Sequence, residues 1–220
     1  MVAEAPVATL SEQRVILDHI SWSTYESLLA DYLDSSAVRF AYDQGVLEIV
    51  CPSTPHEEDN RTLAQVVELV ADERGFDVRN VGSMTYKRDD LQRGFEPDSS
   101  FYIQHAELLR SAGQIDLTID PPPDLIIEIE VSRTAFDKLP MYARIGVPEI
   151  WRGDGERVTI HSLQPNATYL EVSASVALPP LTSEVLTRFL ADSHSLGRRA
   201  WNRLIRTWAR EQAAMGTPPG

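Results

Sequence analysis

Apolar and polar residues recur along the chain with two periods, one typical of helices and the other typical of strands. Residues 56–75 form the clearest helix, because Leu63, Val66 and Val70 fall on one stripe at helical spacing and Gly75 provides a natural stop. This segment is long enough to pack along a whole sheet, so we expect it to be a major element of the core.

Residues 124–131, with the sequence DLIIEIEV, form the clearest strand. Alternation places two sets of side chains on opposite faces, namely Leu125, Ile127, Ile129 and Val131 on one, and Asp124, Ile126, Glu128 and Glu130 on the other. The first set is entirely apolar, so that face is predicted to lie on the core.

Shorter patterns predict the remaining elements. Ser23 and Glu26 resemble a capping box at the start of a helix, and a turn at residues 43–45 joins two strands. The further helices predicted are 22–33, 105–112, 136–146, 183–193 and 198–212, and the further strands and hairpins are 37–50, 76–81, 83–87, 98–103 and 149–163. Residues 89–97 are predicted to form a polar loop.

The order of these elements predicts a mixed α/β (α+β) domain, in which helices flank one mixed sheet. We expect residues 1–20 to form a loose N-terminal arm and residues 21–193 to form the domain. Residues 194–220 are then a C-terminal amphipathic helix and tail.

Composition narrows the class of protein. Of 220 residues 43% are hydrophobic, which is ordinary for a globular chain and excludes a disordered or collagen-like one. No apolar stretch approaches the roughly 20 residues of a membrane span, and no secretory signal is recognisable, so we expect a cytoplasmic protein without a membrane partner. The single cysteine, Cys51, excludes an intramolecular disulfide and a zinc site built from cysteines.

The formal net charge is −13, from 20 Lys and Arg against 33 Asp and Glu. Such an acidic chain argues against a broad nucleic-acid-binding surface. The exception is the last predicted helix, whose basic stripe consists of Arg199, Arg203, Arg206 and Arg210 and whose apolar stripe consists of Trp201, Leu204, Ile205 and Trp208. One interpretation is that this helix docks nucleic acid or another partner. The other is that its tryptophans pack on the domain or on a second subunit, while its arginines are solvated or pair with acidic residues.

Glu128 and Glu130 are the sharpest chemical signal, because two carboxylates on one face of an apolar strand repel each other and are costly to bury. A divalent cation would relieve both costs, and Mg²⁺ or Mn²⁺ accepts such oxygen ligands. The alternative is that this face is solvent-exposed and the pair belongs to an ordinary surface.

Four further residues carry candidate chemistry. Asp98 follows Pro97 at the start of a short strand, where it is either a ligand or a turn residue. Lys138, one of only two lysines, opens a helix, where a cation opposes the helix dipole. It therefore either has a functional role or forms a salt bridge with Asp137 or a neighbouring acid. His56 and Glu57 open the long helix, where Glu57 also suits the dipole without any further role.

Three blocks of the sequence resemble the Uma-type family of restriction-endonuclease-like proteins, which belongs to the PD-(D/E)XK nuclease superfamily. They are GVLEIVCPSTPHEEDNRTL, FEPDSSFYI and PPDLIIEIEVSRTAFDKLPMYARIGVPEIW, and the resemblance covers roughly residues 20–190. It implies a restriction-endonuclease-like core and a Mg²⁺- or Mn²⁺-dependent hydrolysis of DNA.

The resemblance also implies roles for particular residues. Asp98 matches the aspartate of the family's PD motif, and Glu128 matches its (D/E) position. The lysine of the motif would fall at 130, where this chain has Glu130, and Lys138 resembles a lysine that has migrated to the next helix. Glu57 matches the acid that many members carry on their first core helix.

By this resemblance, Asp98 and Glu128 would hold the metal with Glu130 or Glu57 assisting. Lys138 would stabilise the attacking hydroxide or the negative charge on the phosphorane. The substitution at 130 leaves a second hypothesis open, in which a weak or inactive member of the family acts as a binding or assembly module. DNA is the expected substrate, and a homodimer is an open alternative to a monomer.

Overall fold

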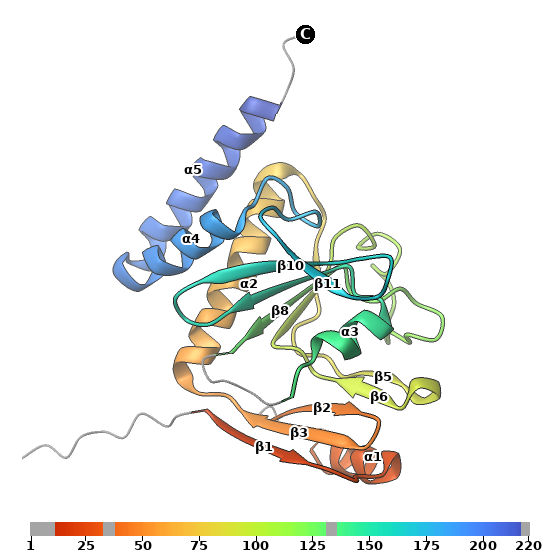
Figure 1. The fold of residues 1–220 in the computed structure, drawn as a ribbon. Helices are drawn as coiled ribbons and strands as arrows, with labels where there is room; N and C mark the ends of the chain where they lie inside the picture. Colours follow the sequence, from red (N-terminus) through yellow and green to blue (C-terminus); the bar gives the residue numbers. More distant parts are fainter. Residues whose placement is uncertain (1–11, 33–37, 131–135, 217–220) are drawn as a thin grey trace, which may run out of the picture.

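Two β-sheets share the core of the computed structural model, which describes residues 12–32, 38–130 and 136–216 (Figure 1). The first sheet has the strand order β1-β3-β2-β6-β5, and the second has the order β11-β10-β9-β8-β7-β4. The mixed α+β class predicted from the sequence is confirmed, whereas the prediction of one sheet is wrong. Short strands at 86–88 and 93–95 join the N-terminal hairpin in the first sheet, which is separate from the sheet that contains residues 125–129.

The bounds of the elements follow the predicted order closely. The helices are α1 (Trp22–Asp31), α2 (Thr54–Arg74), α3 (Leu139–Ile145), α4 (Ser183–Ser195) and α5 (Arg198–Gly216), with one 3₁₀ turn at Asp89–Leu91. The strands are β1 (Gln13–Leu17), β2 (Arg39–Asp43), β3 (Val46–Cys51), β4 (Arg79–Asn80), β5 (Tyr86–Arg88), β6 (Arg93–Phe95), β7 (Ser99–Tyr102), β8 (Leu125–Ile129), β9 (Glu149–Gly153), β10 (Val158–Leu163) and β11 (Tyr169–Val172).

The first sheet is antiparallel throughout and packs α1 against one face. Tyr25 of α1 is fully buried against Tyr42 of β2, with the two rings stacked at 5.0 Å between centroids. The helix begins at Ser21, whose side chain accepts a hydrogen bond from the N–H of Thr24. The predicted capping box at Ser23 is therefore wrong by two residues, since the serine before the helix performs this role.

The second sheet is covered on both faces. Helices α2 and α4 pack on one face and α5 packs against those two helices, while α3 lies on the other face, between the two sheets (Figure 1). The strands β8 and β9 are parallel and are joined through α3, while their outer neighbours are antiparallel. This arrangement places β8 in the middle of the molecule.

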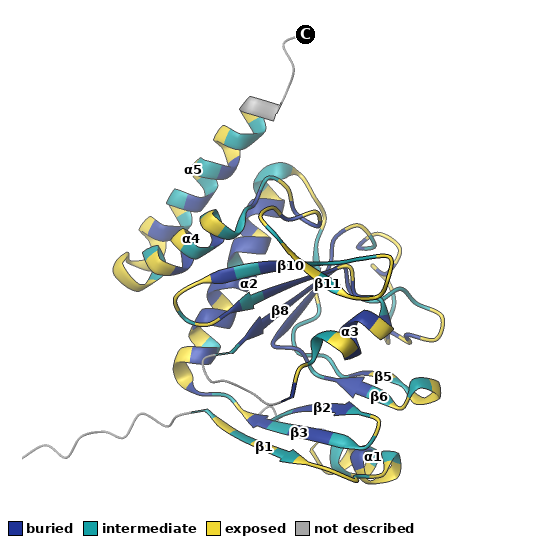
Figure 2. Ribbon diagram, viewed as in Figure 1, coloured by how far each residue is buried: buried dark blue, intermediate teal, exposed yellow. Residues whose placement is uncertain are grey.

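Every residue of β8 is buried, as its dark blue ribbon shows in Figure 2. Leu125, Ile127 and Ile129 contribute to the cluster under α2 and α5, whereas Ile126 contributes to the cluster around α3. The face that carries Glu128 is therefore not a wet surface, and the interpretation of that glutamate as an ordinary surface residue is wrong. Val131, the last residue of the predicted strand, lies outside the described residues.

Three other expectations need correction. The predicted loose arm contains β1, which pairs with β3 over its whole length and forms the edge of the first sheet. The predicted polar loop at 89–97 contains β6, whose small Gly94 lets the ring of Tyr25 lie directly against the strand. The predicted helix at 105–112 is a series of turns instead.

The C-terminal helix α5 lies along α2. Trp201 is fully buried in the core cluster, and its indole N–H donates a hydrogen bond to the backbone carbonyl of Phe189 at 2.7 Å. On the polar side Arg206 and Arg210 form ion pairs with Glu73 of α2. Packing on the domain, the second of the two interpretations of this helix, therefore accounts for most of its pattern. No helix in the described part of the chain is long and apolar enough to cross a membrane.

Candidate active site

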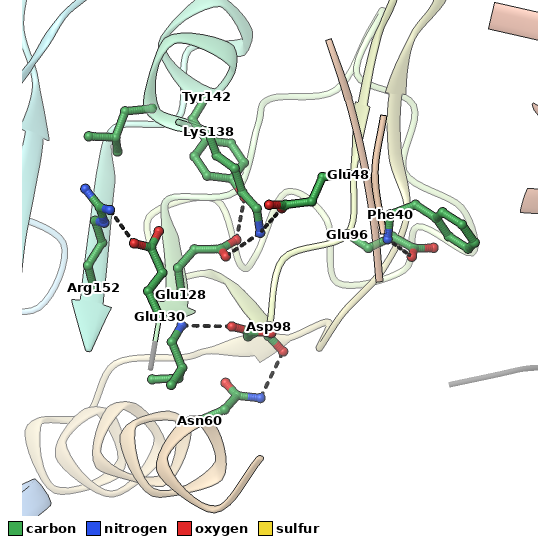
Figure 3. Close-up of polar contacts among 12 residues, drawn as sticks. Phe40, Glu48, Asn60, Glu96, Asp98, Glu128, Glu130, Lys138, Tyr142 and Arg152 are labelled. Atoms are coloured by element: carbon green, nitrogen blue, oxygen red, sulfur yellow. Dashed lines mark hydrogen bonds and ion pairs between the residues drawn. The ribbon is translucent and has the colours of Figure 1, made fainter. Parts of the chain in front are cut away.

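Asp98 and Glu128 meet where the start of β7 lies beside the end of β8. The antiparallel register aligns Ser99 with Ile127, so that the next position of the ladder places Asp98 opposite Glu128. The N–H of Ile129 donates a hydrogen bond to Oδ2 of Asp98 at 2.8 Å (Figure 3). Two carboxylates that are 30 positions apart in the sequence thus share one buried location because two strands pair.

Lys138 and Tyr142 reach Glu128 from α3. The Lys138 ammonium donates a hydrogen bond to Oε2 of Glu128 at 2.8 Å, and the Tyr142 hydroxyl donates one to Oε1 (Figure 3). Residues four positions apart lie on the same face of a helix, so the first turn of α3 presents both side chains together. Glu128 is the anion that a lysine at the start of a helix requires.

The charges of this group are strongly coupled. Burial raises the pKa of Glu128 to about 7, with the Lys138 charge opposing that rise and the Asp98 charge adding to it. Burial would lower the pKa of Lys138, but the carboxylates of Glu128, Glu48 and Asp98 outweigh burial and raise it. Lys138 is therefore a cation at neutral pH, whereas Glu128 stands near its midpoint.

Asp98 is held in its charged form. Burial would raise its pKa, but His56, the Lys138 charge and the N–H of Ile129 together lower it below its usual value. Asn60 of α2 adds a mechanical restraint, since its side-chain amide donates a hydrogen bond to the backbone carbonyl of Asp98 at 3.1 Å. The long helix thus fixes the strand end that carries this carboxylate.

His56 and Glu12 extend the group on one side. Nε2 of His56 lies 2.8 Å from Oδ1 of Asp98, and Nδ1 lies 2.6 Å from Oε2 of Glu12. Burial lowers the pKa of His56, but its contacts with Asp98 and Glu12 outweigh burial and raise it to about 10. The imidazole is therefore a buried cation between two carboxylates at neutral pH.

Arg14 and Glu48 extend the group on the other side. Arg14 of β1 lies 2.8 Å from Oε1 of Glu12 and 2.5 Å from Oε1 of Glu48. Glu48 of β3 is fully buried, and its Oε2 lies 3.7 Å from the ammonium of Lys138. Glu48 and Tyr142 were not predicted as site residues. A charged residue inside the apolar run VLEIV was the available signal for Glu48.

Two of the predicted site residues are engaged elsewhere. Glu130 follows the end of β8 and forms an ion pair with Arg152, which lies in register with Glu128 on β9 (Figure 3). Glu57 is partly exposed and forms an ion pair with Arg39 at 3.1 Å. Of the four predicted metal ligands, the structure thus brings Asp98 and Glu128 together and pairs the other two with arginines.

The donor set at the centre suits a divalent cation on electrostatic grounds. Asp98 and Glu128 offer carboxylate oxygens, which are the ligands that Mg²⁺ and Mn²⁺ prefer. Burial raises the pKa of Glu128, and a cation bound beside this carboxylate would favour its charged form. In the described residues no group of three or more His, Cys, Asp or Glu side chains is already arranged as a metal site. Because Lys138 bonds Oε2 of Glu128, a bound cation would have to compete with Lys138 for that oxygen.

Comparisons with known proteins bear on the family and on the fold. Residues 22–192 match the model of the Uma2 family, described as "putative restriction endonuclease", and no curated protein matches the chain. Among solved structures, a putative nuclease of the DUF820 group from Anabaena variabilis superposes with a TM-score of 0.50 at 16% identity, over 74% of this chain and 98% of that one. That likeness shows the fold. The match over 22–192 confirms the resemblance found in the sequence, and the chain belongs to the Uma2 family of putative restriction endonucleases.

Proposed function

We propose that this protein is a metal-dependent endonuclease that hydrolyses phosphodiester bonds of DNA, with Asp98, Glu128 and Lys138 as its catalytic residues. Membership of a family of putative restriction endonucleases supports a nuclease. The contact between Lys138 and Glu128 carries the assignment of residues, because it supplies a lysine to a motif that has Glu130 in the lysine position.

Asp98 and Glu128 would hold one Mg²⁺ or Mn²⁺ ion between them. When bound, such an ion polarises a phosphodiester oxygen and lowers the pKa of a water molecule, which makes that water a better nucleophile. The hydrogen bond from the Ile129 N–H and the anchor from Asn60 hold Asp98 in place for this role. Tyr142 bonds Oε1 of Glu128, so that Oε2 would be shared between Lys138 and the metal ion.

Lys138 acts as a cation in this proposal and not as a base. Its pKa is raised by three neighbouring carboxylates, so it keeps its proton at neutral pH. Its side chain is 11% exposed, so it lies at the edge of the buried group of charges. From there the ammonium can stabilise the negative charge that grows on the phosphate during attack, and can donate a proton to the leaving oxygen.

Cleavage of DNA is the direct test. Single-stranded, double-stranded and mixed-sequence substrates are incubated with Mg²⁺, Mn²⁺ or a chelator, using wild type, Asp98→Asn and Lys138→Gln. Lys87→Gln is the matched control, since Lys87 is the only other lysine and pairs with Glu26 on the surface of the first sheet. We expect metal-dependent cleavage by wild type and Lys87→Gln, and its loss in the other two variants.

Two results would change the proposal. Cleavage that survives Lys138→Gln but not Asp98→Asn would keep the metal site and remove the role of the lysine. Failure of wild type to cut any substrate, in the presence of either metal, would favour the second hypothesis of a binding or assembly module built on a nuclease fold.

A further inference from the structure

The N-terminal strand β1 lies outside the segment that matches the family, yet it contacts the catalytic centre. The match begins at residue 22, whereas Glu12 and Arg14 reach His56 and Glu48 from the edge of the first sheet. We propose that Glu12 and Arg14 are positioning residues of the catalytic centre, Glu12 acting on Asp98 through His56 and Arg14 acting on Lys138 through Glu48. This inference rests on the proposed function.

The first half of the inference concerns Asp98. His56 is 2% exposed and touches Asp98 with one ring nitrogen and Glu12 with the other. A ring held at both nitrogens cannot turn without losing a charged contact, so Glu12 determines how the imidazole faces Asp98. The orientation of the Asp98 carboxylate, and hence its readiness to bind a cation, then depends on Glu12, the residue that directly precedes β1.

The second half concerns Lys138. Arg14 contacts Glu48 through one guanidinium nitrogen and Glu12 through another. Glu48 in turn stands 3.7 Å from the ammonium of Lys138, which already bonds Glu128 at 2.8 Å. Arg14 neutralises part of the charge of Glu48 and keeps that carboxylate from drawing Lys138 away from Glu128.

Together these contacts form one line of alternating charges that joins the two catalytic carboxylates. The line runs Asp98, His56, Glu12, Arg14, Glu48, Lys138, Glu128. The side chains of this line are buried or nearly so, and a buried charge that loses its partner is left uncompensated. Removing Arg14 of β1, or Glu12 directly before it, should therefore disturb the site at both ends of the line.

The geometry of β1 provides its own control. Arg14 and Ile16 point to the face of the sheet that carries Glu48, because Arg14 aligns with Val50 and Ile16 aligns with Glu48 on β3. Val15 points to the opposite face and is 51% exposed. A change at Val15 thus alters the same strand without touching the line of charges.

The experiment compares Glu12→Gln and Arg14→Gln with two controls in the full-length chain. Val15→Thr controls for the strand, and Glu58→Gln controls for the loss of an exposed carboxylate two positions after His56. Two quantities are measured for each: the dissociation constant for Mn²⁺ without DNA, and the melting temperature without metal. We expect Glu12→Gln to weaken Mn²⁺ binding by about tenfold, the usual effect of losing a partner that orients a ligand, and both controls to bind as wild type.

Cleavage at saturating Mn²⁺ separates the role of Arg14 toward Lys138 from the role of Glu12 toward Asp98. We expect Arg14→Gln to lower its rate by about tenfold through Lys138, and Arg14→Lys, which keeps the cation, to recover most of it. If Arg14→Gln does not fold, the Mn²⁺ affinity of Glu12→Gln still tests the proposal. This variant is expected to fold, because glutamine keeps the shape of the side chain and can still bond Arg14.

The outcomes are distinguishable from failure of the proposed function. If wild type cuts no DNA but Glu12→Gln still weakens Mn²⁺ binding tenfold, the nuclease proposal fails and the positioning role stands. Equal Mn²⁺ affinity in wild type and folded Glu12→Gln would overturn the positioning role, whatever the activity. Equal weakening in Glu58→Gln would also overturn it, because loss of charge alone would then explain the effect. Absence of Mn²⁺ binding by wild type would overturn both proposals.

Discussion

Lys138 reaches Glu128 across ten positions of sequence, with its ammonium 2.8 Å from the carboxylate. A lysine at position 130 would have come from the same strand as Glu128, but that position holds Glu130. The chain instead supplies the cation from the start of α3, which packs over the carboxyl end of β8. A lysine thus contacts this carboxylate, although it comes from a different place in the sequence.

Replacing Lys138 should separate catalysis from metal binding. In Lys138→Gln we expect cleavage to fall by about 100-fold or more, since the cation that stabilises charge on the phosphate is gone. Mn²⁺ affinity should stay equal or rise, because Lys138 no longer competes for Oε2 of Glu128. Titration of Mn²⁺ alongside single-turnover cleavage measures both, and a large loss of Mn²⁺ affinity would instead make Lys138 a support for the metal ligands.

The raised pKa of Glu128 predicts how stability depends on pH in the absence of metal. The ordinary pKa is 4.5 and burial raises it to about 7, so between those values only the folded protein keeps the proton. Stability from this group is therefore present below about pH 4.5 and is lost as pH rises to about 7, by about 3 kcal/mol.

Urea unfolding with a chelator checks this prediction. Between about pH 5 and about pH 8, wild type should lose about 3 kcal/mol more stability than Glu128→Gln, which cannot titrate at this position. Mn²⁺ should raise the melting temperature of wild type more at the higher pH, where the carboxylate is free to bind it. Parallel pH profiles for the two proteins would contradict the raised pKa.

Glu130 and Glu57 were predicted to assist in metal binding, and their ion pairs lead to a sharper expectation. Each would have to exchange an arginine, Arg152 or Arg39, for the metal. We therefore expect Glu130→Gln and Glu57→Gln to change Mn²⁺ affinity by less than about threefold, whereas Asp98→Asn abolishes it. A tenfold loss of Mn²⁺ affinity in either glutamine variant would show that the replaced glutamate is a metal ligand.

Trp201 should anchor the C-terminal helix to the domain. The side chain is fully buried and its indole N–H bonds the carbonyl of Phe189. We expect Trp201→Ala to lower the free energy of unfolding by about 3–5 kcal/mol, as large aromatic truncations in cores do. Arg199→Ala on the exposed side of the same helix should change it by less than about 0.5 kcal/mol. Chemical denaturation of both variants tests this, and equal values would show that α5 does not share the main core.

Much of the architecture can be predicted from local pattern alone. The long helix α2 ends at Gly75, which adopts a left-handed conformation with φ of 71°, as expected of a glycine that stops a helix. The hairpin of β2 and β3 turns where the pattern placed it. These features depend on spacing of apolar residues and on turn chemistry within a few positions, so they are visible in the sequence.

The sequence by itself therefore determined the fold class, the family, and the candidacy of Asp98, Glu128 and Lys138. The short strands β6 and β11 and the division into two sheets were beyond it, because strand pairing depends on partners distant in the chain.

Only the tertiary structure decided which charges meet. Glu128 and Glu130 are indistinguishable by spacing, yet one faces Lys138 inside the protein and the other faces Arg152. Glu12, in a segment that local pattern assigned to a loose arm, lies 2.6 Å from His56 because β1 pairs with β3. The free energy of a buried charge depends on neighbours brought together by folding, and those neighbours are not adjacent in sequence.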